Sequence, residues 1–350
     1  MRMKLTPDLV EAAVLGGAVL GGGGGGRIDV SLETARLALT YGEPELWSLD
    51  EIDEDDIVAV VAGVGAPGAP EQHLIPAHHV NSLRALQGLL AQRQHGAQIK
   101  GLTTNENGAM GTVNGWLQAA VLGLPVLDAP CNGRAHPTAL MGSLGLHRDA
   151  DYVATAGFAG GAAGRYIEGA ISGHLARVSK LVREASVEAG GLVAVARNPV
   201  SVARLARDGA PGGISQAIRI GQALLGQGVA GVAKELDGRV VATGVVEDFV
   251  IEQRGGFDVG RVCIGDMDAT FVNEYMTVDV AGQRLASFPE LAMTFDVDSG
   301  RPLVTADLAL GQRVALLVAP RDRLLLSSTM DMPELMEPVA ALLGREVQAA

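Results

Sequence analysis

The sequence is poor in cysteine, in aromatic residues and in positive charge, and two of these shortages exclude whole classes of protein. Its two cysteines, Cys131 and Cys263, are too few and too far apart for a disulfide framework or a cysteine-based zinc site. The formal net charge of −13 argues against a nucleic-acid partner, because phosphate binding needs clustered Lys and Arg. The sequence also lacks an uncharged apolar run of the roughly 18 residues that a membrane span requires.

What the sequence does contain points to a globular enzyme. It is 48% hydrophobic but only 3% aromatic, and it has 47 glycines, which is typical of an α/β protein packed with small aliphatic side chains. Its 350 residues are too many for one ordinary core and indicate two domains. Asp8 and Glu11 interrupt the apolar start, so we expect no signal peptide and a cytoplasmic protein.

The pattern of apolar residues changes character near residue 160. Residues 1–160 alternate helical and strand patterns, which predicts an α/β domain with a mostly parallel sheet. Residues 161–350 predict an α+β domain that is mostly helical over 166–190 and 199–226 and becomes strand-rich, with hairpins, from residue 238. The strands expected in the first domain span residues 46–49, 57–64, 99–103 and 125–127.

Reactive side chains are most concentrated in the segment GLPVLDAPCNGRAHP, residues 123–137. A short apolar strand leads directly into Asp128, Asn132, Arg134 and His136. Because ligands of open α/β sheets gather at the carboxyl ends of strands, these residues are candidates for catalysis. The alternative is that Asp128 caps a helix, Arg134 pairs with it and His136 packs in the core.

A second candidate group follows the strand expected at 99–103. Asn105 and Glu106 lie at its end, and a carboxylate among amides can act as a general acid or base. Since this strand and the one at 125–127 are expected to be neighbours, Glu106 should share a site with Asp128. The alternative is a turn that caps the next helix.

Three further features are candidates for ligand binding. Glu71 and His73 stand two apart in an extended segment, a spacing that suits substrate binding, metal ligation or proton transfer. Gly23 and Gly24, in the glycine run 21–26, permit close approach of a substrate to the backbone, although the run could also be a plain connector. Glu274 places a carboxylate in a strand, where it could bind substrate or form a surface salt bridge.

No nucleotide is expected, because the glycine run follows a helix instead of a strand and lacks the Lys-Ser/Thr of a P-loop. A divalent metal stays open, with Asp128, His136, Glu71 and His73 as candidate ligands. Cys131, beside Arg134 and His136, could be an activated thiol, although we favour packing.

Taken together, these segments resemble the S-methyl thiohydantoin desulfurase-like family, also described as hydantoinase-like. The matching pieces run in the family's order and cover nearly the whole chain: LGGGGGG, VAGVGAPGAPEQHLIP, GLPVLDAPCNGRAHP, RGGFDVG, FVNEYMTV, and FPELAMTFDVDSGRPL followed by LGQRVALLVAP. The resemblance implies a two-part fold and hydrolytic removal of sulfur from the carbon between two ring nitrogens. The chain departs from the family's usual Asp-Ala-Asp-Gly-Met-Gly-Arg-Ala-Phe-Pro-Glu at two acidic positions, which are Pro130 and Thr138 here.

We therefore expect a hydrolase of a small cyclic amide or thioamide. Asp128 is the expected base or metal ligand, Arg134 the anchor for an anion, and His136 the proton shuttle. Glu106, Asn132, Asn105 and Glu71 should complete a polar pocket. The alternatives are a non-catalytic sensor or partner subunit of a hydantoin-degrading complex, and a thiol enzyme that uses Cys131. A homo-oligomer is compatible with the sequence.

Overall fold

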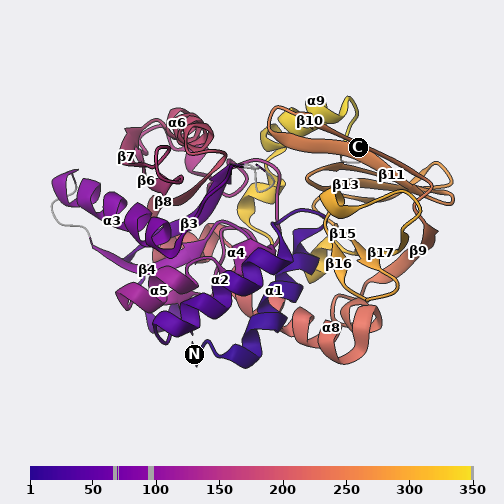
Figure 1. The fold of residues 1–350 in the computed structure, drawn as a ribbon, viewed down its shortest axis with the longest axis horizontal. Coiled ribbons are helices and arrows are strands. Elements are labelled where there is room, and N and C mark those ends of the chain that lie inside the picture. The colour runs from indigo at the N-terminus through magenta and orange to yellow at the C-terminus, as the bar shows by residue number, and fades with distance from the viewer. Residues whose placement is uncertain (66–68, 70, 94–97, 348–350) are drawn as a thin grey trace.

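The computed structural model describes residues 1–65, 69, 71–93 and 98–347 and arranges them in two halves (Figure 1). The N-terminal half is a large mixed sheet covered by helices. The C-terminal half consists of two antiparallel sheets. This is the predicted class, an α/β part followed by a strand-rich α+β part. The turn-rich sequence of residues 65–70 predicts a loop, and residues 66–68 and 70 of it lie outside the described residues.

The N-terminal sheet has eight strands in the order β1-β2-β5-β4-β3-β8-β6-β7. The four strands β2, β5, β4 and β3 are parallel, and the strands at both edges are antiparallel to them. The strands are β1 Arg2–Lys4, β2 Glu45–Trp47, β3 Ile57–Gly65, β4 Ile99–Thr104, β5 Val126–Leu127, β6 Ala154–Gly160, β7 Ile167–Gly173 and β8 Leu192–Ser201. The parallel strands therefore end on one edge, as the βαβ pattern predicted.

Helices surround this sheet and extend from it into the second half. Leu83, Leu86 and Leu90 of α3 lie on one face of the helix at the 3.6-residue spacing, and all three are fully buried. The helices are α1 Pro7–Gly21, α2 Ile28–Tyr41, α3 Pro76–Arg93, α4 Ala109–Val113, α5 Trp116–Leu122, α6 Leu175–Glu188, α7 Val202–Asp208, α8 Gly213–Glu235 and α9 Glu337–Leu343.

The chain across the division expected near residue 160 forms a hairpin of the first sheet. Strands β6 and β7 pair antiparallel across it, and β8 then pairs with both β3 and β6. The sheet therefore continues to Ser201, past the division expected near residue 160. The expectation that 166–190 is mostly helical is wrong in its first part, because Ile167–Gly173 forms the edge strand β7.

The C-terminal half contains a five-stranded sheet, β10-β11-β12-β13-β14, and a four-stranded sheet, β16-β15-β17-β9. Their pairs are all antiparallel, as the predicted hairpins require. The strands are β9 Arg239–Val245, β10 Asp248–Arg254, β11 Phe257–Ile264, β12 Met267–Val272, β13 Glu274–Val280, β14 Gln283–Ser287, β15 Leu291–Asp296, β16 Pro302–Leu303 and β17 Arg313–Ala319.

Helices α1 and α8 join the two halves. Val19 and Leu20 of α1 share a buried cluster with Leu291 and Phe295 of β15. The two helices cross so closely that a Cβ at Gly16 would lie 1.7 Å from the Ala217 carbonyl oxygen, so glycine is required there. This crossing fixes the end of α1, and with it the glycine run, at the boundary between the halves (Figure 1).

No helix in the described part of the chain is long and apolar enough to cross a membrane.

Candidate functional site

The ends of β4 and β5 lie side by side, and this brings Glu106 to His136. The Cys131 amide donates to the Thr104 carbonyl oxygen at 2.9 Å, and the Asn107 amide donates to that of Asn132 at 3.1 Å. These bonds hold the segment after β4 against the segment after β5. Neighbouring parallel strands end on the same edge of a sheet, so the strand order brings the segments that follow β4 and β5 together.

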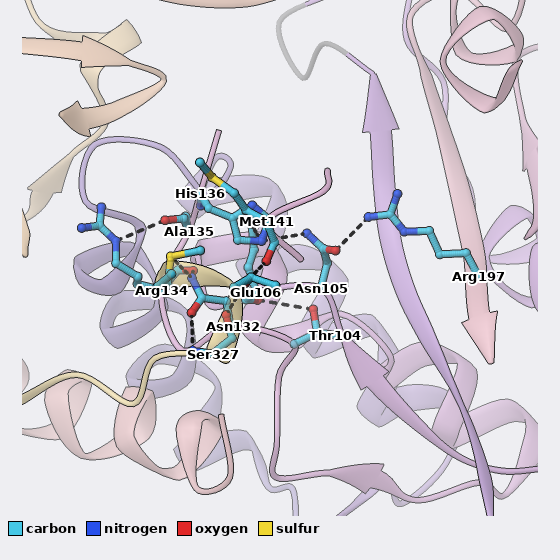
Figure 2. A network of polar contacts seen from close by, with 12 residues as sticks. Thr104, Asn105, Glu106, Asn132, Arg134, Ala135, His136, Met141, Arg197 and Ser327 are labelled. Carbon is cyan, nitrogen blue, oxygen red and sulfur yellow. Dashed lines mark hydrogen bonds and ion pairs between the residues drawn. The ribbon is translucent and has the colours of Figure 1, made fainter. Parts of the chain in front are cut away.

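Glu106 and His136 form the centre of the site (Figure 2). Oε2 of Glu106 accepts a hydrogen bond from the His136 backbone amide at 3.2 Å and lies 3.2 Å from Nε2 of its ring. The His136 side chain is 1% exposed and that of Glu106 is 21% exposed. The carboxylate is therefore the member of the pair that solvent or a ligand can reach.

The surroundings set the protonation of both groups near neutral pH. Burial raises the pKa of Glu106 to about 7, against the opposing effects of the His136 amide, Arg197 and Arg134. Burial, together with the positive charge of Arg197, lowers the pKa of His136 to about 3. A neutral imidazole thus lies beside a carboxyl group that exchanges its proton near pH 7, which is where a general base works best.

Asn105 connects this pair to Arg197. Its Nδ2 lies 3.4 Å from Nε2 of His136, and its Oδ1 accepts a hydrogen bond from Nη2 of Arg197 at 2.8 Å (Figure 2). Arg197 is on β8, which pairs with β3 opposite Val60. Arg197 was not among the site residues predicted from the sequence, although a single arginine directly after the apolar run LVAVA was a detectable signal.

Arg134 is fully buried and points from the first half into the second. Its Nη1 donates to the carbonyl oxygens of Pro289 at 3.0 Å and Glu290 at 2.5 Å, and its Cζ lies 4.5 Å from the ring centroid of Phe288. Burial lowers the pKa of Arg134 to about 10, while Glu274 and Glu106 act in the opposite direction. Nη2 is buried without a partner among the described residues.

Glu274 begins β13 and is only 3% exposed. Its Oε2 has no hydrogen-bond partner in the described part of the molecule, and burial, reinforced by the charge of Glu106, raises its pKa well above the ordinary value. The surface salt bridge considered for Glu274 is therefore wrong. A buried carboxyl group without a partner is costly, which marks it as a candidate for ligand binding.

The glycine run lies against Arg134 and Glu274. A Cβ at Gly22 would lie 2.5 Å from Nη2 of Arg134, and one at Gly24 would lie 2.1 Å from Oε1 of Glu274. The Tyr275 amide donates to the Gly22 carbonyl oxygen at 2.8 Å, and the Thr305 amide donates to that of Gly23 at 2.8 Å. The run is thus a tightly held turn whose lack of side chains leaves room for the two charged groups.

The Asp128 carboxylate has a different set of partners. Oδ1 accepts from the amides of Ile214 and Ser215 at 2.9 and 3.0 Å, and Oδ2 accepts from the Ser215 hydroxyl at 2.5 Å. These are the first amides of α8, so Asp128 caps that helix. The alternative that Asp128 caps a helix is therefore confirmed. A catalytic role for Asp128 stays a prediction.

Asn132 is likewise occupied by the fold. Its Oδ1 accepts from the Ser327 amide at 3.0 Å, and its Nδ2 donates to the Arg134 carbonyl oxygen at 2.8 Å. Asn132 therefore positions the chain around Arg134 (Figure 2).

Glu71 and His73 lie on the surface, away from this network. Glu71 pairs with Arg165 at 2.8 Å, and its side chain is 60% exposed. In the described ranges, no three His, Cys, Asp or Glu side chains gather in a way that could hold a metal ion. The four candidate ligands Asp128, His136, Glu71 and His73 thus do not converge.

Cys131 is fully buried in the apolar cluster beneath the loop. Burial raises the pKa of its thiol to about 12, so the thiolate needed for nucleophilic attack is scarce at neutral pH. This environment favours the packing role over the thiol enzyme.

Comparison with known proteins identifies the family. The S-Me-THD-like N-terminal domain matches residues 8–161, and the S-Me-THD-like C-terminal domain matches residues 174–338. The chain therefore belongs to the S-Me-THD-like family, as its motifs predicted. A crystal structure of a protein from Chromobacterium violaceum has the same fold, with a TM-score of 0.74, 23% identity and 98% of each chain covered. No curated protein matches the chain.

Proposed function

We propose that this protein hydrolyses a small cyclic thioamide or amide, a ring of the thiohydantoin or hydantoin type. The observation that carries the proposal is the Glu106–His136 pair, a partly exposed carboxyl group with a pKa of about 7 beside a buried neutral imidazole. Membership of the S-Me-THD-like family supports this substrate class. Glu106 replaces Asp128 as the proposed base, because both Asp128 oxygens already accept hydrogen bonds from α8.

The proposed reaction is the addition of water to the ring carbon that carries sulfur. Ionised Glu106 takes one proton from the water as its oxygen bonds to that carbon. In an S-methyl ring, where this carbon is doubly bonded to a ring nitrogen, the carbon–sulfur bond then breaks, Glu106 returns its proton to the departing methanethiol sulfur, and the second water proton moves to that nitrogen. In a thiohydantoin, where the carbon is doubly bonded to sulfur, both water protons go to the sulfur, which leaves as hydrogen sulfide. His136, whose Nε2 lies 3.2 Å from Oε2 of Glu106, stays neutral and holds the carboxyl group in place.

Arg134 supplies the positive charge for this step. A negative charge develops on the ring as water adds, and a fixed guanidinium in a buried environment stabilises it more than water would. Three of its contacts, to the carbonyl oxygens of Ala135, Pro289 and Glu290, hold the side chain rigidly and leave Nη2 free. The cation is therefore already in place before substrate binds.

The test is to incubate the purified protein with an S-methyl thiohydantoin, a thiohydantoin and hydantoin. Release of thiol or sulfide is followed with a colorimetric thiol reagent, and ring opening by mass spectrometry. We expect thiol or sulfide from the sulfur-containing rings, and about 100-fold less or lower still from a sample in which Glu106 is replaced by glutamine. Binding of these rings without any product would instead support the sensor or partner-subunit alternative.

A further inference from the structure

Two buried charged side chains, one from each half of the molecule, each keep one polar atom unused. Arg134 is 0% exposed and Glu274 is 3% exposed, and Nη2 of the first and Oε2 of the second lack partners among the residues described. They attract each other electrostatically, yet they form no ion pair. Buried polar groups are almost always hydrogen-bonded, so an unused donor and an unused acceptor in one buried region call for an explanation.

Both side chains pack against the same three-residue turn. Nη2 of Arg134 lies where the Cβ of residue 22 would be, and the Glu274 carboxyl group lies where that of residue 24 would be. Neither group can be held in this way if the turn carries side chains. The turn therefore has a cationic donor against Gly22 and a carboxyl group against Gly24, at the boundary between the halves.

We propose that Arg134 and Glu274 recognise the amide edge of the substrate ring, its carbonyl oxygen and the adjacent N–H. This inference rests on the proposed function and names the groups that select the ring. Arg134 donates from Nη2 to the carbonyl oxygen, and Glu274 accepts the ring N–H at Oε2.

The two unused atoms, a donor on Arg134 and an acceptor on Glu274, favour a neutral ligand that offers an acceptor and a donor side by side. An ammonium ligand would be repelled by Arg134, and a carboxylate ligand has no N–H to donate to Oε2 of Glu274. An amide satisfies both atoms and brings no charge of its own. In a five-membered ring the carbonyl oxygen and the N–H point to the same side, whereas in an ordinary trans peptide they point to opposite sides. The pair therefore selects a ring amide over an open-chain one.

A substituent on the ring nitrogens removes the donor and adds bulk where Glu274 lies. Hydantoin and 1,3-dimethylhydantoin are therefore the matched probes, because they share the ring and carbonyl groups and differ only at the two nitrogens. We expect hydantoin to bind about 10- to 100-fold more tightly, because the dimethyl ring leaves the buried acceptor of Glu274 without a partner. Equal binding of the two probes, or no binding of hydantoin, would overturn the proposal.

Calorimetric titrations should use the Glu106→Gln protein, in which we expect the bound ring to stay intact. Replacing Glu274 by methionine in that background keeps the volume and removes the acceptor. The preference for hydantoin over its dimethyl derivative should then largely disappear, whereas Glu274→Gln should keep part of it. A preference unchanged by Glu274→Met would contradict the assignment, since a purely structural carboxyl group cannot set selectivity between two ligands.

If Glu274→Met does not fold, Gly24→Ala tests the same contact, because its methyl group would displace Oε1 of Glu274. Gly88→Ala is the control, since a Cβ at Gly88 meets no atom within 4 Å. Gly24→Ala should lose the preference for hydantoin and Gly88→Ala should keep it. The proposal for recognition and the proposed function can fail separately. A wild-type protein that binds hydantoin more tightly than its dimethyl derivative but releases no product contradicts only the proposed function.

Discussion

Two regions of the molecule contain carboxyl groups that are at least partly buried. In one region the carboxylate has a full set of hydrogen bonds, and in the other the carboxyl groups have few. Asp128 accepts three hydrogen bonds from the start of α8, which satisfy both of its oxygens. Glu106 and Glu274 receive far less compensation for burial, and their pKa values rise. A carboxylate whose two oxygens accept hydrogen bonds from a helix start therefore supports the fold, whereas an undercompensated one keeps its reactivity.

The largest expected effect separates Glu106 from Asp128 by activity. Glu106→Gln should lower kcat/KM for ring hydrolysis by about 10²- to 10⁴-fold, because the amide keeps the shape of the side chain but cannot take a proton. Asp128→Asn should lose far less, since an amide oxygen can still cap α8. Glu43→Gln, on an exposed surface, serves as the control. The opposite ranking would return the role of base to Asp128.

The same Glu106→Gln change should stabilise the protein at higher pH. The folded state binds the Glu106 proton more tightly than the unfolded state, because burial raises the pKa from 4.5 to about 7. As pH rises from 4.5 to 7, the unfolded state ionises first, and the wild type loses up to about 3 kcal/mol relative to the variant. Chemical denaturation of both proteins at pH 5 and pH 8 measures this difference, and a gap that does not widen would show that Glu106 is not buried at such a cost.

Asp128→Ala should have a moderate effect on stability. The loss of the cap leaves the Ile214 and Ser215 amides without their acceptor, at a cost of about 2 kcal/mol in the free energy of unfolding. Urea denaturation should show this loss, while Asp128→Asn should retain most of the stability. An Asp128→Ala protein of unchanged stability would mean that the cap contributes nothing.

The smallest effect is expected at Cys131. Cys131→Ala should cost about 1 kcal/mol of stability through lost packing and leave turnover nearly unchanged. Iodoacetamide should likewise not inactivate the wild type, because the thiol is buried and protonated. Inactivation that a substrate ring protects against would revive the thiol mechanism.

The sequence predicted the parallel strands and the meeting of Glu106 with His136 for one physical reason. Apolar runs identify buried parallel strands, and parallel neighbours end on the same edge of a sheet. It could not predict that β8 adds antiparallel to β3 and delivers Arg197, because strand pairing across more than 130 residues depends on tertiary packing.

The position of the glycine run shows a second limit of sequence reasoning. Its proximity to Glu274 depends on how two halves of the chain dock, and no local pattern encodes that contact. Residue spacing in the sequence also could not assign roles to the acidic residues that follow the strands. Asp128 and Glu106 both follow strands. They differ because the amides of α8 donate to Asp128, which therefore caps that helix.

The pH dependence of ring hydrolysis tests the central claim most directly. In the wild type, kcat/KM should rise with pH and level off above about 7, because only ionised Glu106 can accept a proton from water. The residual activity of Glu106→Gln should lack this rise. A rise near pH 7 that persists in Glu106→Gln, or a wild-type profile that is flat from pH 5 to pH 9, would contradict the assignment of Glu106 as the base.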